Sequence, residues 1–191
     1  MADKAKLTGI VLAGGRSVRM GCDKASLPWG DSDLLHTVLG ALAPVCARLI
    51  VVSNLPRVIT LPAVDVVADS YPGCGPLGGI QAGLAASGTD YNFVAACDMP
   101  YIDSRAVDYM AAAVNGFDAA VPFIDGYFNP LHAIYHRRCL AAIEEMLKQG
   151  HLRITDLYPK VRLRLVSAEE LGQFRPDCAM LRNLNSPADL V

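Results

Sequence analysis

Short apolar segments alternate with segments of helical periodicity along the whole chain, and this alternation constrains the fold more than any other feature. Short apolar runs are typical of buried strands, and longer stretches with apolar residues three and four positions apart are typical of helices. The predicted strands are residues 10–13, 49–53, 65–68, 91–97, 118–123, 132–135, 161–166 and 181–184. The predicted helices are residues 34–45, 76–86, 105–114, 138–148 and 152–157, with a last helical turn at Pro187. The alternation predicts a three-layer, Rossmann-like α/β fold with a mostly parallel central sheet.

Polar residues, proline and glycine mark the ends of these helices. Ser32 and Asp103 each precede a helical segment, so we expect both to be N-caps. Pro76 suits the first position of a helix, where its missing N–H costs nothing. Gly116 and Gly150 follow helical segments and are expected to end them.

Length and composition predict one globular domain over residues 1–191. Apolar residues make up 52% of the chain and charged residues 19%, which suits a sizeable core. The net charge of −2 argues against a nucleic-acid partner. The chain shows neither an apolar run that could cross a bilayer nor a signal peptide, so we expect no membrane association. The six cysteines form no C-x-x-C pair, which argues against zinc and favours the reducing cytoplasm.

A glycine-rich loop with three cations follows the first predicted strand. Residues 12–24 read L-A-G-G-R-S-V-R-M-G-C-D-K. Gly14 and Gly15 let backbone N–H groups approach an anion, and Arg16, Arg19 and Lys24 add positive charge. The loop matches neither the Walker A pattern nor the dinucleotide fingerprint G-x-G-x-x-G. It predicts a cradle for a triphosphate; the alternative is a surface loop with solvated arginines.

Asp98 directly follows the strongly apolar strand predicted at residues 91–97. In a parallel sheet, ligands bind beyond the carboxyl ends of the strands, where this carboxylate is expected to lie. Mg²⁺ prefers carboxylate and phosphate oxygens, so Asp98 is the candidate metal ligand and Mg²⁺ the expected cofactor. A helix-capping or turn aspartate is the alternative, but Asp103 is the better cap for the next helix.

The pattern L-A-G-G-x-S-x-R-M-G-x-D-K resembles the signature loop of the molybdenum cofactor guanylyltransferases. Those enzymes join GMP, taken from GTP, to molybdopterin. The resemblance implies that the backbone of Leu12, Ala13, Gly14 and Gly15 holds the nucleotide. It also implies that Arg16 and Arg19 neutralise phosphates, that Lys24 lies near the α-phosphate, and that Asp98, in the family's D-x-P segment, binds the metal. We therefore expect the catalytic residues to be Lys24, Arg19 and Asp98.

The same resemblance extends to two further segments on the nucleotide side. Asp69 precedes a glycine- and proline-rich stretch that ends in Gly78 and Gly79, and it matches an aspartate that binds the nucleotide in the family. After the second strand the family has an asparagine that contacts the nucleotide, which aligns with Asn54 or, one residue earlier, with Ser53. From the sequence alone, both segments are also consistent with ordinary strand-end turns.

The acceptor side is implied by the last segment of the chain. Asn183 and Asn185, with Ser186 and Pro187, look like the family's closing N-x-N-[ST]-P, and on a strand the two asparagines would point the same way. Arg153 follows a glycine that ends a helix, as does the family arginine assigned to molybdopterin. Residues 128–133 resemble the P-L-x-A segment that lines the family's acceptor pocket.

Several functions stay open at this stage. The resemblance implies GMP transfer, because the related cytidylyltransferases usually carry L-A-A-G in the first loop and lack the P-L-x-G segment. The alternatives are cytidylyl transfer to molybdopterin, nucleotidyl transfer to a sugar phosphate, or a binding module without catalysis. Expected partners are GTP and molybdopterin, together with upstream molybdopterin-carrying proteins and molybdoenzyme chaperones.

Overall fold

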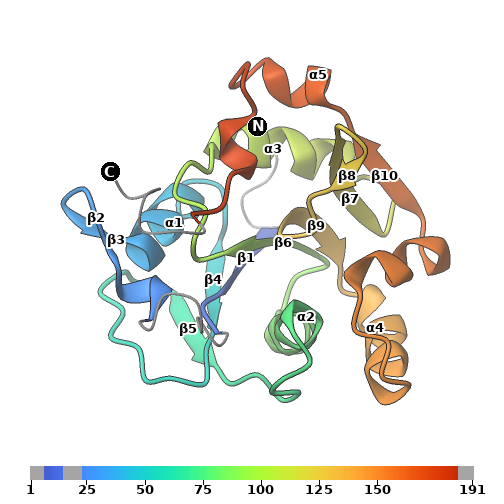
Figure 1. The fold of residues 1–191 in the computed structure, drawn as a ribbon, viewed down its shortest axis with the longest axis horizontal. Coiled ribbons are helices and arrows are strands. Elements are labelled where there is room, and N and C mark those ends of the chain that lie inside the picture. Colours follow the sequence, from blue (N-terminus) through green and yellow to red (C-terminus); the bar gives the residue numbers. More distant parts are fainter. Residues whose placement is uncertain (1–6, 15–22, 185–191) are drawn as a thin grey trace.

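A computed structural model describes residues 7–14 and 23–184, which are built around one central sheet (Figure 1). The strand order across the sheet is β10-β7-β9-β6-β1-β4-β5. β1 (Leu7–Leu12) lies inside the sheet, with β4 (Arg48–Val52) and β6 (Tyr91–Ala96) parallel to it on its two sides. β5 (Val64–Val67) extends this parallel group beyond β4.

The other half of the sheet mixes strand directions. β9 (His132–His136) runs antiparallel to both β6 and β7 (Ala119–Ile124). β10 (Leu163–Val166) is parallel to β7. β8 (Tyr127–Phe128) forms a hairpin with β7. The predicted fold class is confirmed, as a mixed sheet with a parallel core.

Helices cover both faces of the sheet and make the three layers (Figure 1). α1 (Leu34–Leu42) and α3 (Ser104–Ala113) share one apolar core with the strands, and α2 (Pro76–Ala86) and α4 (Cys139–Lys148) share the other. Strand side chains alternate between these cores, so strands buried on both faces carry almost continuous apolar runs. Each fully buried aliphatic side chain stabilises the fold by about 1.5–3 kcal/mol.

α2 packs unusually close to the central strand. A Cβ added at Gly83 would lie 2.4 Å from Cγ2 of Ile10, so only glycine lets the helix approach β1 this closely. The helix begins at Pro76, and it spans the residues that the sequence predicted. Its N-terminus therefore has a fixed position beside the end of β1.

Of the two predicted helix N-caps, one is confirmed and the other is wrong. Asp103 caps α3 by accepting a hydrogen bond from the N–H of Arg105. The prediction that Ser32 caps α1 is wrong: the cap is Asp33, whose carboxylate accepts from His36 N at 2.8 Å. Ser32 instead pairs with Trp29 in a short hairpin formed by β2 (Pro28–Trp29) and β3 (Ser32–Asp33).

The prediction of a strand at residues 181–184 is also wrong. The chain forms a 3-10 helix, Ala179–Leu181, and then continues without regular structure to Leu184. The N–H of Leu184 donates to the carbonyl of Asp98 at 2.9 Å, so the segment lies against the end of β6. It cannot add a strand there because both neighbours of β6 are already in place.

Two more helices lie between α4 and the 3-10 helix Ala179–Leu181. The predicted helix at 152–157 is a 3-10 helix, Ile154–Lys160, and α5 (Ala168–Gly172) is a short helix that the sequence did not predict. Pro187, expected to open a helical turn, lies outside the described residues. Among the helices that the structure describes, none has both the length and the apolar character needed to cross a bilayer.

Candidate active site

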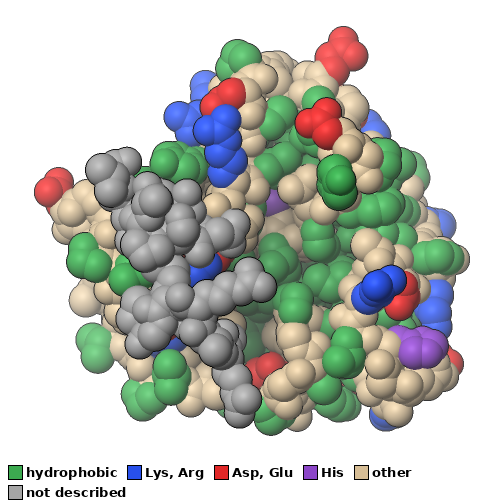
Figure 2. All heavy atoms as spheres, viewed as in Figure 1, with side chains coloured by type: hydrophobic (Ala, Val, Ile, Leu, Met, Phe, Trp, Pro, Cys, Tyr) green, Lys and Arg blue, Asp and Glu red, His purple; other side chains and the backbone are tan. Residues whose placement is uncertain are grey.

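The parallel strands bring the predicted site residues to one edge of the sheet. In the register of the strands, Leu12 of β1 is level with Val52 of β4 and Ala96 of β6, and Val52 is level with Val67 of β5. The segments that follow these four strands contain Gly14, Asn54, Asp69 and Asp98. This edge is where parallel α/β sheets bind their ligands. Figure 2 shows that the centre of the viewed face is hollowed, with hydrophobic side chains on its floor.

An ion pair joins the end of the glycine-rich loop to the end of β6. Nζ of Lys24 lies 2.9 Å from Oδ2 of Asp98 and donates a second hydrogen bond to the carbonyl of Leu184 at 2.8 Å. The Lys24 and Asp98 side chains are 19% and 13% exposed. The two residues are far apart in the sequence, yet the fold places their charges in contact in a largely shielded position.

Asn183 completes the contacts of Asp98. Its Nδ2 donates to Oδ1 of Asp98 at 2.9 Å. Sequence reasoning expected Asn183 on a strand, but it reaches Asp98 from the irregular segment after Ala179–Leu181. Its predicted partner Asn185 lies outside the described residues, as do Gly15, Arg16 and Arg19.

Asp98 has the chemistry of a magnesium ligand that depends on substrate phosphates. Among the described residues, Lys24 donates to one carboxylate oxygen and Asn183 to the other, and a carboxylate oxygen can accept more than one such bond. Within the described residues, no cluster of three or more His, Cys, Asp or Glu side chains could form a complete protein cage for a metal. Mg²⁺ commonly binds one or two carboxylates together with phosphate oxygens, so the residues present fit that arrangement.

The predicted nucleotide-side residues Asn54 and Asp69 lie together. Oδ1 of Asn54 accepts from the N–H of Asp69 at 2.8 Å, and Oδ1 of Asp69 accepts from Tyr71 N at 2.8 Å. The alternative residue, Ser53, is buried, and its hydroxyl is bonded within its own loop. The side chain of Asn54 thus connects the ends of β4 and β5.

Gly78 and Gly79 lie in the first turn of α2 and are both buried. A Cβ at Gly78 would lie 2.9 Å from the Tyr71 carbonyl oxygen and 3.0 Å from Oδ1 of Asp69, and one at Gly79 would lie 3.1 Å from Cδ2 of Leu12. The two glycines therefore let α2 start directly against the Asp69 turn and β1. Their predicted contact with the nucleotide stays a prediction.

Leu12 and Ala13 are buried at the base of the loop. The Leu12 carbonyl accepts from Cys97 N at 3.1 Å, and the Ala13 N–H donates to the Val52 carbonyl at 2.9 Å. Among the described residues, the nearest atom to a Cβ added at Gly14 would be the Val52 carbonyl oxygen, at 3.7 Å. On the acceptor side, Arg153 is exposed and comes just before the 3-10 helix Ile154–Lys160; the hydrogen bonds described for Asp98 do not include it.

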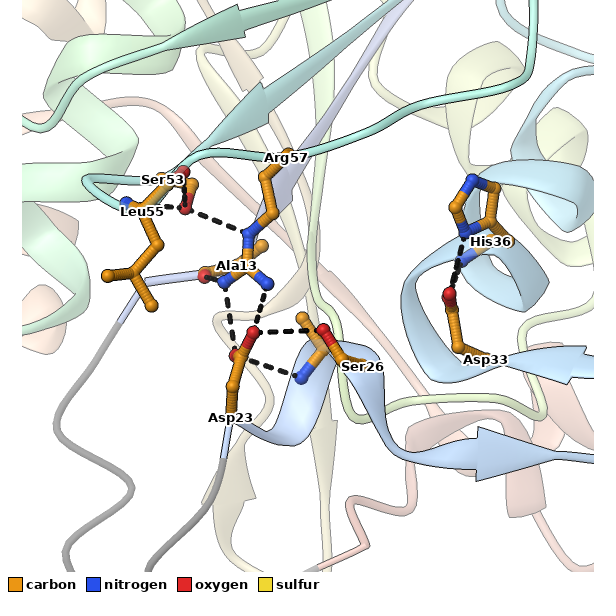
Figure 3. Close-up of polar contacts among 9 residues, drawn as sticks. Ala13, Asp23, Ser26, Asp33, His36, Ser53, Leu55 and Arg57 are labelled. Atoms are coloured by element: carbon orange, nitrogen blue, oxygen red, sulfur yellow. Dashed lines mark hydrogen bonds and ion pairs between the residues drawn. The ribbon is translucent and has the colours of Figure 1, made fainter.

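Arg57 belongs to the site, although no sequence pattern pointed to it. Its side chain is 5% exposed, and its guanidinium donates to the Ala13 carbonyl at 2.7 Å and to both oxygens of Asp23 (Figure 3). Nε donates to the Ser53 hydroxyl at 3.0 Å. The hydrogen bond from Arg57 is the main cause that lowers the pKa of Asp23 below its ordinary value. Arg57 thereby joins the two ends of the glycine-rich loop to each other and to β4.

We expect Arg57→Met to lower the free energy of unfolding by about 2 kcal/mol, because the change removes a buried donor from the Ala13 carbonyl and the positive charge that is paired with Asp23. The Asp23 carboxylate then keeps only its donors from Ala25 N and Ser26 Oγ. The activity of the site should also fall, since Lys24 directly follows Asp23. Urea unfolding and initial rates measure the two effects. The matched control is Arg105→Met, which removes an exposed arginine paired with Asp103 and should change stability by less than about 1 kcal/mol. Equal losses in both variants would contradict the role of Arg57.

Cys97, next to Asp98, is not a nucleophile. Burial is the main cause that raises the pKa of its thiol to about 12, so the thiolate is scarce at neutral pH. The polar side chains that meet at the end of β6 are instead a lysine, a carboxylate and an amide. Such groups bind and orient phosphates and neutralise their charge.

Solved nucleotidyltransferases share this fold. The 2-C-methyl-D-erythritol 4-phosphate cytidylyltransferase from Thermus thermophilus superposes with a TM-score of 0.72 over 97% of this chain and 95% of its own, at 16% identity. The fold is therefore that of the nucleotidyltransferase class. Within the class, the model of the MobA-like NTP transferase domain matches residues 9–161, and the chain belongs to this family.

Relatives within the family are similar over nearly their whole length. A Pelotomaculum thermopropionicum protein named "Probable molybdenum cofactor guanylyltransferase" is 39% identical over 96% of this chain and 90% of its own. The molybdenum cofactor guanylyltransferase of Syntrophotalea carbinolica is 35% identical over 95% and 88%. The crystal structure of molybdopterin-guanine dinucleotide biosynthesis protein A from Archaeoglobus fulgidus has a TM-score of 0.80 at 25% identity, covering 96% of this chain and 94% of that one.

Proposed function

We propose that this protein transfers GMP from GTP to the terminal phosphate of molybdopterin and releases pyrophosphate. The observation that carries the proposal is the contact between Lys24 and Asp98 at the carboxyl edge of the sheet. The names of its full-length relatives supply the nucleotide and the acceptor. A glycine-rich loop whose last lysine contacts a carboxylate suits a reaction in which both substrates are anions.

The reaction requires the protein mainly to orient the two substrates and to neutralise their negative charges. An oxygen of the acceptor phosphate attacks the α-phosphorus of GTP, and the bond from that phosphorus to the bridging oxygen of the β-phosphate breaks. Pyrophosphate leaves with the electron pair. A phosphate monoester is already anionic, so no strong general base is required, and orientation with charge neutralisation provides the catalysis.

We assign Lys24 and Asp98 different roles in neutralising the two anionic substrates. In the structure described here, Lys24 is bonded to Asp98, and on GTP binding its ammonium is proposed to turn to the α-phosphate. Asp98, with the phosphate oxygens, would hold Mg²⁺, which supplies further neutralisation of the leaving pyrophosphate. Arg16 and Arg19 are proposed to neutralise the β- and γ-phosphates. Asn54 and Asp69, joined by their hydrogen bond, are proposed to contact the nucleotide itself.

A panel of nucleotides tests the proposal directly. The full chain is incubated with molybdopterin, Mg²⁺ and each of GTP, ATP, CTP and UTP, and the product is identified by mass. We expect the guanine dinucleotide only, and preference for GTP over CTP of at least about 10²-fold in kcat/KM, because wrong exocyclic groups leave polar contacts unpaired. A cytosine product would assign the chain to the alternative reaction. Transfer to sugar phosphates but not to molybdopterin would overturn the acceptor.

Three other expectations are proposals of the same kind. We infer one nucleotidyltransferase domain, since a single sheet carries every described strand apart from the β2–β3 hairpin. We infer a reducing cytoplasmic location, in keeping with Cys97 and Cys139, two buried cysteines that form no disulfide. Molybdopterin-carrying proteins upstream and molybdoenzyme chaperones downstream are the inferred protein partners.

A further inference from the structure

Residues 175–184 form a strap that leads from the turn after α5 to the end of β6 (red in Figure 1). At its beginning, the guanidinium of Arg175 lies over the ring of Tyr101, 5.9 Å from the ring centroid. In its middle, Ala179 and Met180 are buried, and Met180 packs in the apolar core that α1 and α3 share with the sheet. Burial of apolar surface therefore fixes the middle of the strap to the rest of the fold.

The tip of the strap, Asn183 and Leu184, contacts both charged residues of the proposed reaction centre. The N–H of Leu184 donates to the backbone carbonyl of Asp98 at 2.9 Å, and Nδ2 of Asn183 donates to Oδ1 of Asp98 at 2.9 Å. The carbonyl of Leu184 accepts from Nζ of Lys24 at 2.8 Å. Lys24 thus bonds Asp98 and the strap at the same time, so its position helps to decide whether the tip stays closed.

The closed tip holds the Lys24 ammonium in a largely shielded position. The Lys24 side chain is 19% exposed, and two of the three donors of its ammonium are taken by Asp98 and by the Leu184 carbonyl. A triphosphate offers the ammonium several charged oxygens, whereas the Leu184 carbonyl is uncharged, so the attraction to a triphosphate is the larger. An ammonium that turns to a triphosphate therefore gives up its bond to Leu184.

Loss of the bond to Lys24 affects the tip and leaves the rest of the strap in place. The N–H of Arg182 donates to the carbonyl of Ala179 at 3.0 Å, which closes the 3-10 helix at the anchored middle of the strap. Beyond this bond, the described part of the chain has no regular structure. Asn183 also lines a cavity of about 210 Å³ together with Met99 and residues 128–132, so a movement of the tip changes one wall of that cavity.

We propose that the tip is a latch that responds to a bound triphosphate: Lys24 keeps it closed through the Leu184 carbonyl, and a triphosphate that draws the ammonium away loosens it. The inference rests on the proposed function for GTP as the source of the triphosphate. Inorganic triphosphate presents the same charged groups without a base or a ribose, so the measurements below separate the latch from the choice of nucleotide. Binding of the nucleotide thereby changes the cavity wall at Asn183, which links the two sides of the site.

The test measures amide hydrogen exchange in the full chain, with the N–H of Leu184 as the reporter of the tip. Lys24→Met keeps the apolar stem of the side chain and removes its ammonium. Without any ligand, we expect exchange at Leu184 to be at least about tenfold faster in this variant than in the wild type, because one hydrogen bond from a charged donor is lost. Exchange at Val94, inside β6, should not change. Lys160→Ala removes an exposed lysine and is the matched control, which should leave the Leu184 rate unchanged.

A second measurement adds ligands and needs no turnover. GTP with Mg²⁺ and inorganic triphosphate with Mg²⁺ should each speed exchange at Leu184 of the wild type by at least about tenfold, and Lys24→Met should show no further change with either. A response to inorganic triphosphate but not to GTP would support the latch and contradict the proposed function. An unchanged Leu184 rate in ligand-free Lys24→Met, no response of the wild type to either ligand, or an equal rise at Val94 would each overturn the inference.

Discussion

Replacing Lys24 with alanine is expected to reduce guanylyl transfer by about 10²–10³-fold, the usual effect of removing one preorganised donor from a site where negative charge is transferred. The Lys24 ammonium lies 2.9 Å from Asp98 and is largely shielded from water. Charge interactions in such a position are stronger than at an open surface, and no neighbouring described lysine can replace it. Rates of dinucleotide formation at saturating GTP and molybdopterin measure the loss.

Two comparisons make the Lys24 result decisive. Lys148→Ala removes an exposed lysine from the last turn of α4 and should leave transfer unchanged. Thermal unfolding of Lys24→Ala should remain cooperative, because Asn183 still donates to Asp98 and the apolar cores are untouched. A folded Lys24→Ala variant that kept more than about a tenth of the wild-type rate would show that Lys24 is not part of the catalytic machinery.

The meeting of Lys24 and Asp98 was predictable because it depends on topology. A loop after one parallel strand and a carboxylate after its neighbour must share the same edge of the sheet. The register of β1 with β6 brings the two strand ends level, and a lysine side chain spans what remains. α2 was equally predictable, since Pro76 fixes its start by local chemistry.

The features that the sequence did not predict depend on long-range side-chain contacts or on two neighbouring residues that suit the same role. Arg57 reaches back to Ala13 and Asp23 from an irregular loop, and no periodicity encodes such a path. The apolar residues Leu181 and Leu184 suggested a strand, but Leu181 ends a 3-10 helix, and Leu184 lies against the end of β6, both of whose edges are already paired. Asp33 rather than Ser32 caps α1 because the helix begins at Leu34, directly after Asp33, whose carboxylate accepts from the N–H of His36.

The environment of His132 could not be predicted from the sequence for a different reason. In the sequence it stands within an apolar stretch and forms no cluster with the other histidines. Only the structure shows that its nitrogens are buried without hydrogen-bond partners in the described part of the chain. A missing hydrogen bond has no sequence pattern, so a buried histidine with partners and one without them look the same before the fold is known.

Asp98→Asn is expected to lower transfer by about 10²–10³-fold and to make the remaining activity depend on higher Mg²⁺ concentrations. The change keeps the shape of the side chain and an oxygen that can accept from Lys24, but it removes the negative charge that a divalent cation requires. Asp31→Asn, in the turn between β2 and β3, is the control for loss of an exposed carboxylate. Rates are measured across a Mg²⁺ titration at fixed GTP.

The titration separates two roles that Asp98 could have. If Asp98 holds Mg²⁺ together with the phosphates, weaker metal binding moves the midpoint to higher Mg²⁺, and excess metal restores part of the rate. If Asp98 only positions Lys24 through their 2.9 Å contact, the midpoint stays in place and Asp98→Asn loses no further activity in a Lys24→Ala background. We expect the shifted midpoint and an additional loss in the double variant, because a metal ligand and a phosphate-binding cation stabilise different charges in the transition state. An unshifted midpoint would reduce Asp98 to a positioning residue and would remove the proposed metal ligand from the mechanism.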